Sequence, residues 1–403
     1  GSLNAERAVN WTKSEMELLG LDKVWLQPVM VPKWVRGAPE FAYIETSPGN
    51  TTQVNICALG GSISTPATGL KANLVEVKSF EELESLGRDK IQGKIVFYNR
   101  PMDATLIDTF KAYGGCVNQR YEGAVHAIEY GAAGVIVRSM NLKIDDLPHT
   151  GSMTYGEIPV KDRIPSAAIS TQHADLLSSM LKMDNDIQFY FKQNCKQMDD
   201  VLSHNVIGEI TGSEFPDEFI LVGGHLDSWD IGEGAHDDGA GCVHSIGALR
   251  LFQKQNIRPN NTIRAVMFMN EEFGLRGGLK YAEIAVRDGE QHIAAIESDA
   301  SGYVPRGFGF SGSEEQLEKI QDWLKYFDIN TISYFKKGGG GADIGPLHRQ
   351  TGTPMFGLSI DGQKYFEMHH TAKDVFELVH ARELELGTAS LASLIYLIDQ
   401  YGL

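Results

Sequence analysis

Residues 219–241 read FILVGGHLDSWDIGEGAHDDGAG, an apolar run that leads into a loop rich in acids, histidines and glycines. The apolar run, 219–222, is typical of a buried strand, and the small residues after the two adjacent aspartates are typical of the start of a helix. In open α/β sheets, ligands bind at the carboxyl ends of the strands. The stretch therefore predicts a site for something charged at the edge of a buried sheet.

The succession of strand and helix continues through the second half of the chain. The further strands are expected at 262–269, 292–297 and 355–360, and the helices at 241–255, 275–287, 314–327 and 383–401. Strands of Val, Ile, Ala and Met that alternate with helices are typical of a sheet covered on both faces. The predicted fold class is therefore α/β, with a mixed, mostly parallel sheet.

The N-terminal residues predict a helix and a pair of strands. Residues 3–19 carry apolar positions among charged ones, as in an amphipathic helix, and Gly20 is a suitable end for it. The segment 25–31 predicts a strand that Pro32 stops, and 41–44 predicts the strand that returns beside it.

The chain changes character between residues 46 and 200. Short strands separated by Gly, Ser and Pro predict a small α+β or barrel-like unit there. A length of 403 residues also exceeds what one hydrophobic core usually holds. We therefore expect a main domain formed by 1–45 and 201–403, with 46–200 inserted into it.

The composition argues against several classes of protein. The formal net charge of −17 argues against a nucleic-acid surface, because phosphate binding requires clustered Lys and Arg. No apolar run approaches the ~20 residues of a membrane span. The four cysteines form no C-x-x-C pair, so they predict neither a cysteine metal site nor a redox pair, and their disulfide state stays open.

Acids and histidines follow the expected strands of the second half. Any one of them has an ordinary interpretation as a helix cap, a salt-bridge partner or a solvated turn. Together they would crowd carboxylates into one crevice, where they repel one another unless cations neutralise them. Oxygen and imidazole ligands without thiolate suit zinc or a similar divalent ion. The candidates are His225, Asp237, the adjacent Glu271 and Glu272, Asp299 and His370.

Five other histidines have a structural interpretation. His126 and His149 lie in the expected insert, away from any obvious catalytic cluster. His236, His244 and His369 flank the candidate ligands, and His244 falls within the helix expected after the loop. We do not expect these side chains to bind a metal directly.

Several short motifs resemble those of a known family. H-x-D at 225–227, G-A-x-D-D-G-x-G at 234–241, N-E-E-x-G at 270–274, E-S-D-A at 297–300 and H-H-T at 369–371 are similar to the motifs of co-catalytic di-zinc exopeptidases. That family includes glutamate carboxypeptidases and bacterial leucyl aminopeptidases. The resemblance covers nearly the whole chain, including PHTG at 148–151, and the insert resembles a protease-associated domain.

The resemblance implies two zinc ions. In the family, one ion takes the histidine of H-x-D and the aspartate of E-S-D, and the other takes the second glutamate and the late histidine. A carboxylate and a water or hydroxide bridge the two ions. By position, the ligands are His225 and Asp299 for one ion, Glu272 and His370 for the other, and Asp237 as the bridge.

The resemblance also implies two supporting features beside these ligands. Asp227 is expected to be the carboxylate that fixes the tautomer of the His225 imidazole. The peptide bond between Asp237 and Asp238 is expected to be cis.

The two adjacent glutamates are expected to have different roles. Neighbouring side chains of an extended segment point to different sides, so Glu271 and Glu272 cannot readily bind the same metal. Glu271 resembles the family's general base, which takes a proton from the bridging water and later delivers it to the leaving amine.

A glycine-rich stretch, Gly338 to Gly341, precedes Asp343. It lacks the Lys-Ser/Thr of a phosphate-binding loop. We expect its backbone N–H groups to bind a terminus of the substrate, with Asp343 or Tyr365 nearby.

The predicted function is a metal-dependent exopeptidase or dipeptidase that hydrolyses short peptides. The alternatives are an aminopeptidase of the same family that acts on longer peptides, a glutaminyl cyclase with a single zinc, and a receptor-like relative that has lost catalysis. The resemblance further implies a homodimer and an extracytoplasmic location, secreted, lysosomal or periplasmic, after loss of a signal sequence. It also implies that an N-terminal helical segment of the mature protein precedes Gly1.

Overall fold

The computed structural model describes residues 1–327 and 332–403, and this part of the chain forms two compact units. The first consists of Gly1–Pro32, Asp200–Tyr365 and Lys373–Leu403, and the second of Lys33–Asp199 and Phe366–Ala372. The sequence places the insert at 46–200, whereas the second unit starts at Lys33 and also takes up a short late segment.

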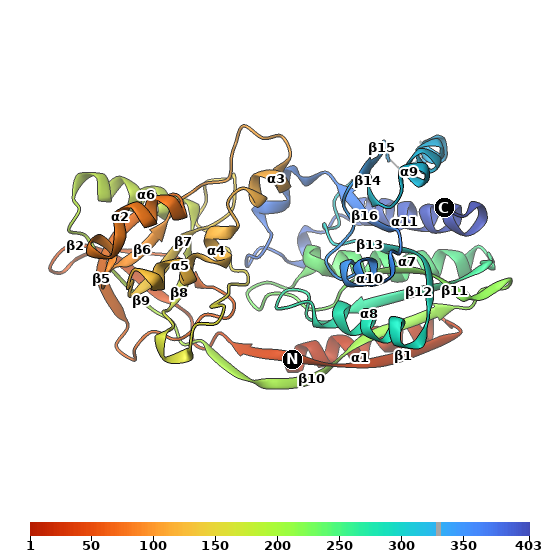
Figure 1. The fold of residues 1–403 in the computed structure, drawn as a ribbon, viewed down its shortest axis with the longest axis horizontal. Helices are drawn as coiled ribbons and strands as arrows, with labels where there is room; N and C mark the ends of the chain where they lie inside the picture. The colour runs from red at the N-terminus through yellow and green to blue at the C-terminus, as the bar shows by residue number, and fades with distance from the viewer. Residues whose placement is uncertain (328–331) are drawn as a thin grey trace. The chain divides into compact units, whose positions relative to one another are not determined.

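The first unit is built on a mixed eight-stranded sheet. Its strands lie in the order β1 (Lys23–Val35), β10 (Lys196–Ile210), β12 (Asn261–Phe268), β11 (Phe215–His225), β13 (Gln291–Glu297), β16 (Met355–Ile360), β14 (Pro305–Ser311) and β15 (Tyr334–Lys337) (Figure 1). The four central strands, β12, β11, β13 and β16, are parallel, whereas β10 and β14 pair antiparallel to their neighbours. The α/β class with a mixed sheet is confirmed.

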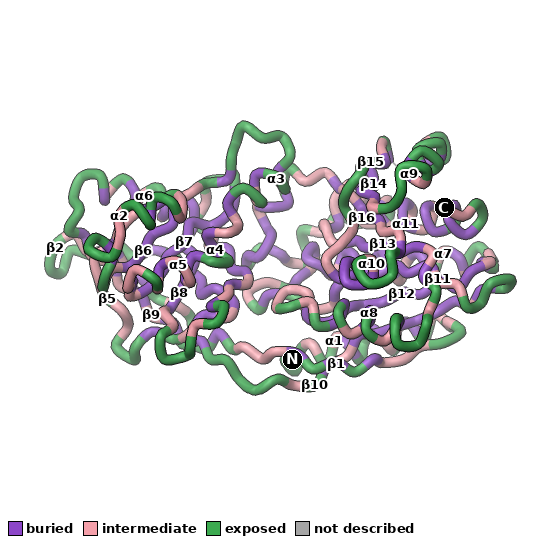
Figure 2. The backbone as a smooth tube through the Cα atoms, viewed as in Figure 1, coloured by how far each residue is buried: buried purple, intermediate pink, exposed green. Residues whose placement is uncertain are grey.

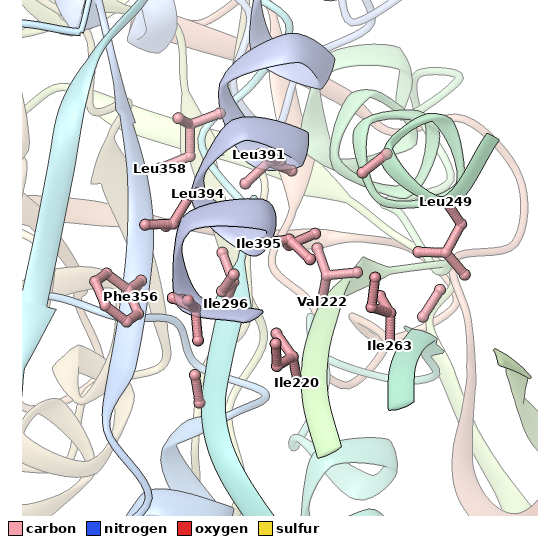
Figure 3. Packing of buried hydrophobic residues seen from close by; sticks show 14 of the residues in the cluster. Ile220, Val222, Leu249, Ile263, Ile296, Phe356, Leu358, Leu391, Leu394 and Ile395 are labelled. Atoms are coloured by element: carbon pink, nitrogen blue, oxygen red, sulfur yellow. The ribbon is translucent and has the colours of Figure 1, made fainter. Parts of the chain in front are cut away.

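Helices cover both faces of this sheet. α7 (Ala240–Lys254) and α11 (Ala381–Tyr401) pack against each other on one face, and α8 (Arg276–Asp288) and α10 (Gly345–Thr351) do so on the other. The central strand β11 serves both layers because its side chains alternate. Ile220 and Val222 join the core beneath α7 and α11 (Figure 3). Leu221 joins the core beneath α8 and α10.

Two further helices, α1 and α9, belong to the first unit. α1 (Leu3–Leu18) contributes Val9 and Met16 to the larger core, and Ser2 accepts the Ala5 N–H at its start. α9 (Glu314–Gln321) begins with a capping box between Ser313 and Gln316. Each helix therefore has a local start signal as well as an apolar face.

The expected pairing of 25–31 with 41–44 is wrong. β1 continues past Pro32 to Val35 and lies beside β10, whereas β2 (Phe41–Ser47) belongs to the second sheet. Proline cannot donate to a strand neighbour, but β1 is an edge strand and has only one neighbour to satisfy. Pro32 is therefore tolerated within the strand instead of ending it.

The second unit has its own eight-stranded sheet. Its order is β3 (Asn50–Val54), β2, β9 (Gln188–Lys192), β5 (Leu70–Val77), β6 (Ile95–Tyr98), β7 (Gly134–Arg138), β8 (Ser166–Ile169) and β4 (Ile56–Ala58). β5 to β8 are parallel, and β3 and β4 form open edges. The sheet is therefore not a closed barrel.

Helices also cover both faces of the second sheet. α6 (Thr171–Met183) packs on one core, and α2 (Phe80–Ile91) and α5 (Gly123–Glu129) pack on the other. Two short helices, α3 (Thr109–Gly114) and α4 (Asn118–Tyr121), precede α5. In both units, buried residues follow the central strands, whereas loops and outer helix sides are exposed (Figure 2). Within the described residues, every helix is too short or too polar to cross a bilayer.

The packing of α11 predicts the cost of a cavity in the first core. Ile395 is fully buried among α7 and the central strands (Figure 3). Ile395→Ala should lower the free energy of unfolding by about 2–5 kcal/mol, because the lost methyl groups leave a space that the neighbours fill only partly. The exposed Glu385→Ala on the same helix should change it by less than about 0.5 kcal/mol. Urea unfolding of both variants measures the difference, and equal midpoints would contradict this packing.

Candidate functional site

Three of the predicted site segments meet at one edge of the first sheet. β11, β12 and β13 are parallel neighbours, so their carboxyl ends lie at the same edge. His225 is the last residue of β11 and lies opposite Phe268, the last residue of β12. Glu271 and Asp299 follow the ends of β12 and β13. Parallel pairing therefore brings together residues that are far apart in the sequence.

His225, Asp237 and Asp299 form a compact cluster at this edge. The Nε2 atom of His225 lies 3.2 Å from Oδ1 of Asp237 and 3.4 Å from Oδ1 of Asp299. One ligand atom from each residue falls within 4.8 Å of the other two. The cluster is therefore small enough for one metal ion to contact all three side chains.

The imidazole of His225 is held from its other side. Its Nδ1 lies 2.8 Å from the backbone carbonyl of Asp227, whereas the nearest carboxylate oxygen of Asp227 is 3.9 Å away. An Nδ1–H that donates to this carbonyl leaves the Nε2 lone pair directed at the acids. The tautomer is thus fixed beside Asp227, by its backbone oxygen.

The carboxylate of Asp227 instead holds the loop that follows β12. Its Oδ1 accepts the backbone N–H groups of Asn270 at 2.5 Å and Glu271 at 3.0 Å. This contact fixes the start of the N-E-E-x-G segment against the H-x-D segment. Asp227 therefore positions both the histidine and the adjacent glutamates.

Asp238 joins the end of β11 to the start of α7. Its carboxylate accepts the N–H of His225 at 3.0 Å and the N–H of Gly241 at 2.9 Å. Gly224 and Gly241 lie so close to this carboxylate that a Cβ at either position would collide with it. A glycine at the end of β11 and another at the start of α7 therefore make room for a buried acid.

Asp374 holds the other side of the same loop, and the sequence did not single it out. Its two carboxylate oxygens accept the N–H of His236 at 2.7 Å and the N–H of Asp237 at 3.1 Å. The peptide between Asp237 and Asp238 is cis, as the resemblance implies. Asp374 lies in the segment HHTAKD, but nothing in the spacing of that segment indicates its partner.

The edge of the sheet carries more negative charge than His225 can neutralise. Burial by itself would lower the pKa of His225, but the charge of Asp299 and the hydrogen bond to Asp237 raise it well above its usual range. Burial and the charge of Asp299 raise the pKa of Asp238 well above that of an ordinary carboxyl. Such shifts mark a place where added positive charge is favourable.

The two adjacent glutamates lie beside this cluster. Burial raises the pKa of Glu271 well above its usual range; the charge of His225 opposes the shift, and Asp299 and Glu272 add to it. Glu271 therefore senses the same charges as the histidine and the aspartates. A cation held there would lower its pKa and favour the carboxylate form.

His370 belongs to the second unit and is held there by the PHTG segment. Its Nδ1 lies 3.3 Å from the carbonyl of Thr150, and its own carbonyl accepts the Thr150 N–H at 3.0 Å. Its environment resembles that of His225 in one respect, because in both histidines a backbone carbonyl lies next to Nδ1. Its role as a ligand stays a prediction.

The two residues expected near the substrate are both buried. Asp343 is 1% exposed and Tyr365 is 6% exposed. Burial raises the pKa of Asp343 well above its usual range, and the charges of Glu297 and Glu271 add to the shift. Burial, with the charge of Asp299, raises the pKa of Glu297 to about 7. Asp343 and Glu297 thus extend the acidic cluster into the interior. Glu297 begins the E-S-D segment, but its sequence position alone does not indicate that it faces these acids.

The flanking histidines of the first unit make structural contacts. His236 stacks on Tyr303 at 4.8 Å between ring centroids. The Nδ1 atom of His244 lies 2.9 Å from Oγ of Ser298, inside α7. In the second unit, His126 stacks on Phe80 and His149 is buried.

Comparison with known proteins identifies the family. Residues 205–394 match the model of peptidase family M28. Carboxypeptidase Q of Bos taurus is 34% identical over 399 residues, which covers 99% of this chain and 81% of that protein. The chain belongs to peptidase family M28. The expected resemblance to exopeptidases of this type is confirmed, and the chain is a peptidase.

Solved structures agree with this assignment. The M28 peptidase precursor from Shewanella amazonensis SB2B is 34% identical to this chain and superposes with a TM-score of 0.93. The superposition covers 100% of this chain and 90% of the Shewanella chain. A zinc aminopeptidase from Bacillus subtilis superposes with a TM-score of 0.67 over 98% of this chain and 89% of its own, at 20% identity. At that identity the likeness concerns the fold alone. The M28 fold thus extends over both units.

The burial of His244 predicts part of the acid sensitivity of the first unit. Burial lowers the pKa of His244 to about 4, so the folded state holds it neutral where an unfolded chain, with a pKa of about 6.5, protonates it. Its contribution is complete above pH 6.5 and is lost as the pH falls toward 4, about 3 kcal/mol in all.

Urea unfolding of the protein in EDTA at pH 7 and pH 5 measures this contribution. His244→Gln should show a smaller loss of stability between the two pH values than the wild type. The exposed His380→Gln serves as the control and should keep the wild-type dependence. Identical dependence in His244→Gln would contradict the assignment.

Proposed function

We propose that this M28 peptidase is a metal-dependent exopeptidase or dipeptidase that hydrolyses short peptides with two zinc ions. The observation that carries the proposal is the convergence of His225, Asp237 and Asp299 within an edge of buried carboxylates. One nitrogen and two oxygen donors suit zinc. Zinc is also part of the name of the aminopeptidase from Bacillus subtilis that shares the fold.

The ligand assignment follows the family motifs. His225 and Asp299 would hold one ion, Asp237 would bridge, and Glu272 and His370 would complete the second position. Bound zinc would polarise the scissile carbonyl, lower the pKa of a water and stabilise the developing oxyanion. The surplus of negative charge around His225 supports a site for more than one positive charge.

The residues of the chain then have separate tasks. Asp227 orients His225 through its carbonyl and fixes the loop of Glu271 through its carboxylate. Glu271 would take the proton of the attacking water and return it to the leaving amine, as a general base and then a general acid. Asp343 would support the acidic cluster around Glu271 instead of binding the substrate directly, because it is buried.

Replacing Glu271 tests the division of labour between the adjacent glutamates. Glu271→Gln should lower kcat by about 10²–10⁴-fold, because the amide cannot accept the proton, and should leave the zinc content unchanged. Glu272→Gln should lose zinc as well as activity. The exposed Glu283→Gln should match the wild type in both measurements. Loss of zinc from Glu271→Gln would mean that the two glutamates have exchanged roles.

The number of zinc ions separates hydrolysis from the cyclase alternative. We expect two ions per chain from elemental analysis of the purified protein. Anomalous scattering at the zinc edge should place one beside His225 and Asp299, with Asp237 between the two. Asp237→Asn should reduce the content of both ions, since it removes the charge that they share. One ion per chain with an intact Asp237 would favour a glutaminyl cyclase.

Dipeptides with a blocked terminus identify which terminus of the substrate the enzyme must bind. A free dipeptide should be cleaved, and its N-acetylated and C-amidated forms should each be cleaved more slowly if both termini are bound. Cleavage of the acetylated form at the full rate would exclude an aminopeptidase, and cleavage of the amidated form at the full rate would exclude a carboxypeptidase. Liquid chromatography of the released amino acids gives the rates.

A further inference from the structure

A second polar site lies at the carboxyl ends of β6 and β7 in the second unit. These strands are parallel neighbours, and Arg138 ends β7 while Arg100 lies two residues beyond β6. A cavity of about 650 Å³ opens there, large enough for a small organic ligand. Its lining combines the polar or charged residues Arg100, Asp103, Lys111, Arg138 and Asn141 with apolar residues such as Met102, Leu106, Leu142 and Ile144.

Arg138 is buried in the wall of this cavity. It is 6% exposed, and its Nη1 donates to Asp175 at 2.6 Å and to Asn99 at 3.2 Å. Its Nε is also buried and has no acceptor among the described residues. The two contacts hold the guanidinium in place, so that Nε is a fixed donor without a partner in the chain.

Asn141 supplies a second donor of the same kind. It is 4% exposed, and its Oδ1 accepts the backbone N–H of Lys143 at 3.0 Å. This bond assigns the amide, because the atom that faces an N–H must be the oxygen. The remaining Nδ2 is buried without an acceptor in the described part of the chain.

Arg100 adds charge as well as a third donor. Gln119 fixes its backbone, with bonds of 3.1 Å to the N–H and 2.7 Å to the carbonyl, and Asn118 accepts from its Nη2. Its Nε is buried without an acceptor, and no acid of the described residues pairs with it. Asp103, the acid of the lining, turns Oδ1 back to the backbone and hydroxyl of Thr105.

Buried donors without acceptors are uncommon, since each loses water on folding without a replacement. Three of them belong to residues that line one cavity, two of these residues being arginines, in a chain whose formal net charge is −17. An oxyanion would satisfy them together, because arginine and amide N–H groups bind carboxylate oxygens with charge-assisted hydrogen bonds. The apolar part of the lining suits a ligand whose anionic group is attached to an apolar body.

We propose that this cavity binds an organic carboxylate with an apolar body, of the kind found in an N-blocked aliphatic amino acid. The carboxylate contacts Arg100, Arg138 and Asn141, and the apolar body lies against Leu106, Leu142 and Ile144. All of these residues belong to the second unit, and none of them is a candidate ligand of the zinc site. The residues of the site are thus distinct from the candidate zinc ligands.

Calorimetric titration of the full chain with N-acetyl-L-leucine tests this proposal. The titration is carried out in EDTA, so that binding through zinc does not contribute. We expect one site in the wild type. N-acetyl-L-leucinamide, which has the same body without the carboxylate, and inorganic phosphate, which has the charge without the body, should each bind at least about tenfold more weakly.

Asn141→Asp provides the decisive variant. The substitution keeps the oxygen that accepts from Lys143 and replaces the donor Nδ2 by an anionic oxygen, so it should weaken binding at least about tenfold with little change in size. Asn50→Asp makes the same change of charge at the exposed start of β3 in the second unit and should bind like the wild type.

If Asn141→Asp binds N-acetyl-L-leucine as tightly as the wild type, or if the wild type does not bind it, the proposed binding site is wrong. If phosphate binds as tightly as N-acetyl-L-leucine, the proposal that the ligand is an organic carboxylate with an apolar body is wrong. Peptidase activity of zinc-loaded Asn141→Asp should equal that of the wild type, and a comparable loss of activity would overturn the separation from the catalytic residues.

Discussion

A buried carboxylate must find hydrogen bonds or positive charge, and the first sheet gathers many of them at one edge. The fold satisfies three through the backbone. Asp227, Asp238 and Asp374 each accept two N–H groups. The bonds of Asp227 and Asp374 each tie one loop of the edge to another, and those of Asp238 tie the end of β11 to the start of α7. Asp237 and Asp299 instead face the imidazole of His225. The acids that hold the loops are thus distinct from the acids that face the candidate metal position.

The buried carboxylate of Asp238 explains two glycines that flank the loop after β11, Gly224 within the strand and Gly241 within α7. Small residues at Gly224 and Gly241 let the backbone approach the carboxylate of Asp238, and a side chain there would occupy the position of its oxygens. The loop can then turn back toward the end of β11. The glycines thus leave room for the carboxylate of Asp238, and this carboxylate in turn holds the end of β11 by accepting the N–H of His225.

The sequence predicts the parts of this arrangement that depend on strand ends. The apolar runs place His225, Glu271 and Asp299 at carboxyl ends, and the parallel order of β11, β12 and β13 brings those ends together as expected. The hydrogen-bond partners of the acids that hold the loops cannot be predicted from strand ends. Asp374 acts through hydrogen bonds to residues more than a hundred positions away in the sequence, and a hydrogen bond to a backbone N–H leaves no mark on the pattern of side chains.

The pairing of β1 shows the same limit. Pro32 is a stop signal only where a strand has neighbours on both sides, and the sequence does not state which strands lie at an edge. The role of Asp227 differs from the predicted one for a related reason. Its position two residues after His225 predicts proximity, but only the fold decides that the carbonyl lies next to the imidazole while the carboxylate holds the following loop.

The edge position of β1 also matters while the chain is being made. β1 pairs with β10, and residues 36–195 separate the two strands, so a ribosome that adds about 5–20 residues per second delivers the partner on the order of ten seconds later. The strands of the second sheet all emerge in that interval. During it, β1 is an unpaired strand that other nascent chains could join. Pro28 and Pro32 lack the N–H groups that such a pairing needs. They therefore disfavour aggregation through this strand until β10 has been synthesised.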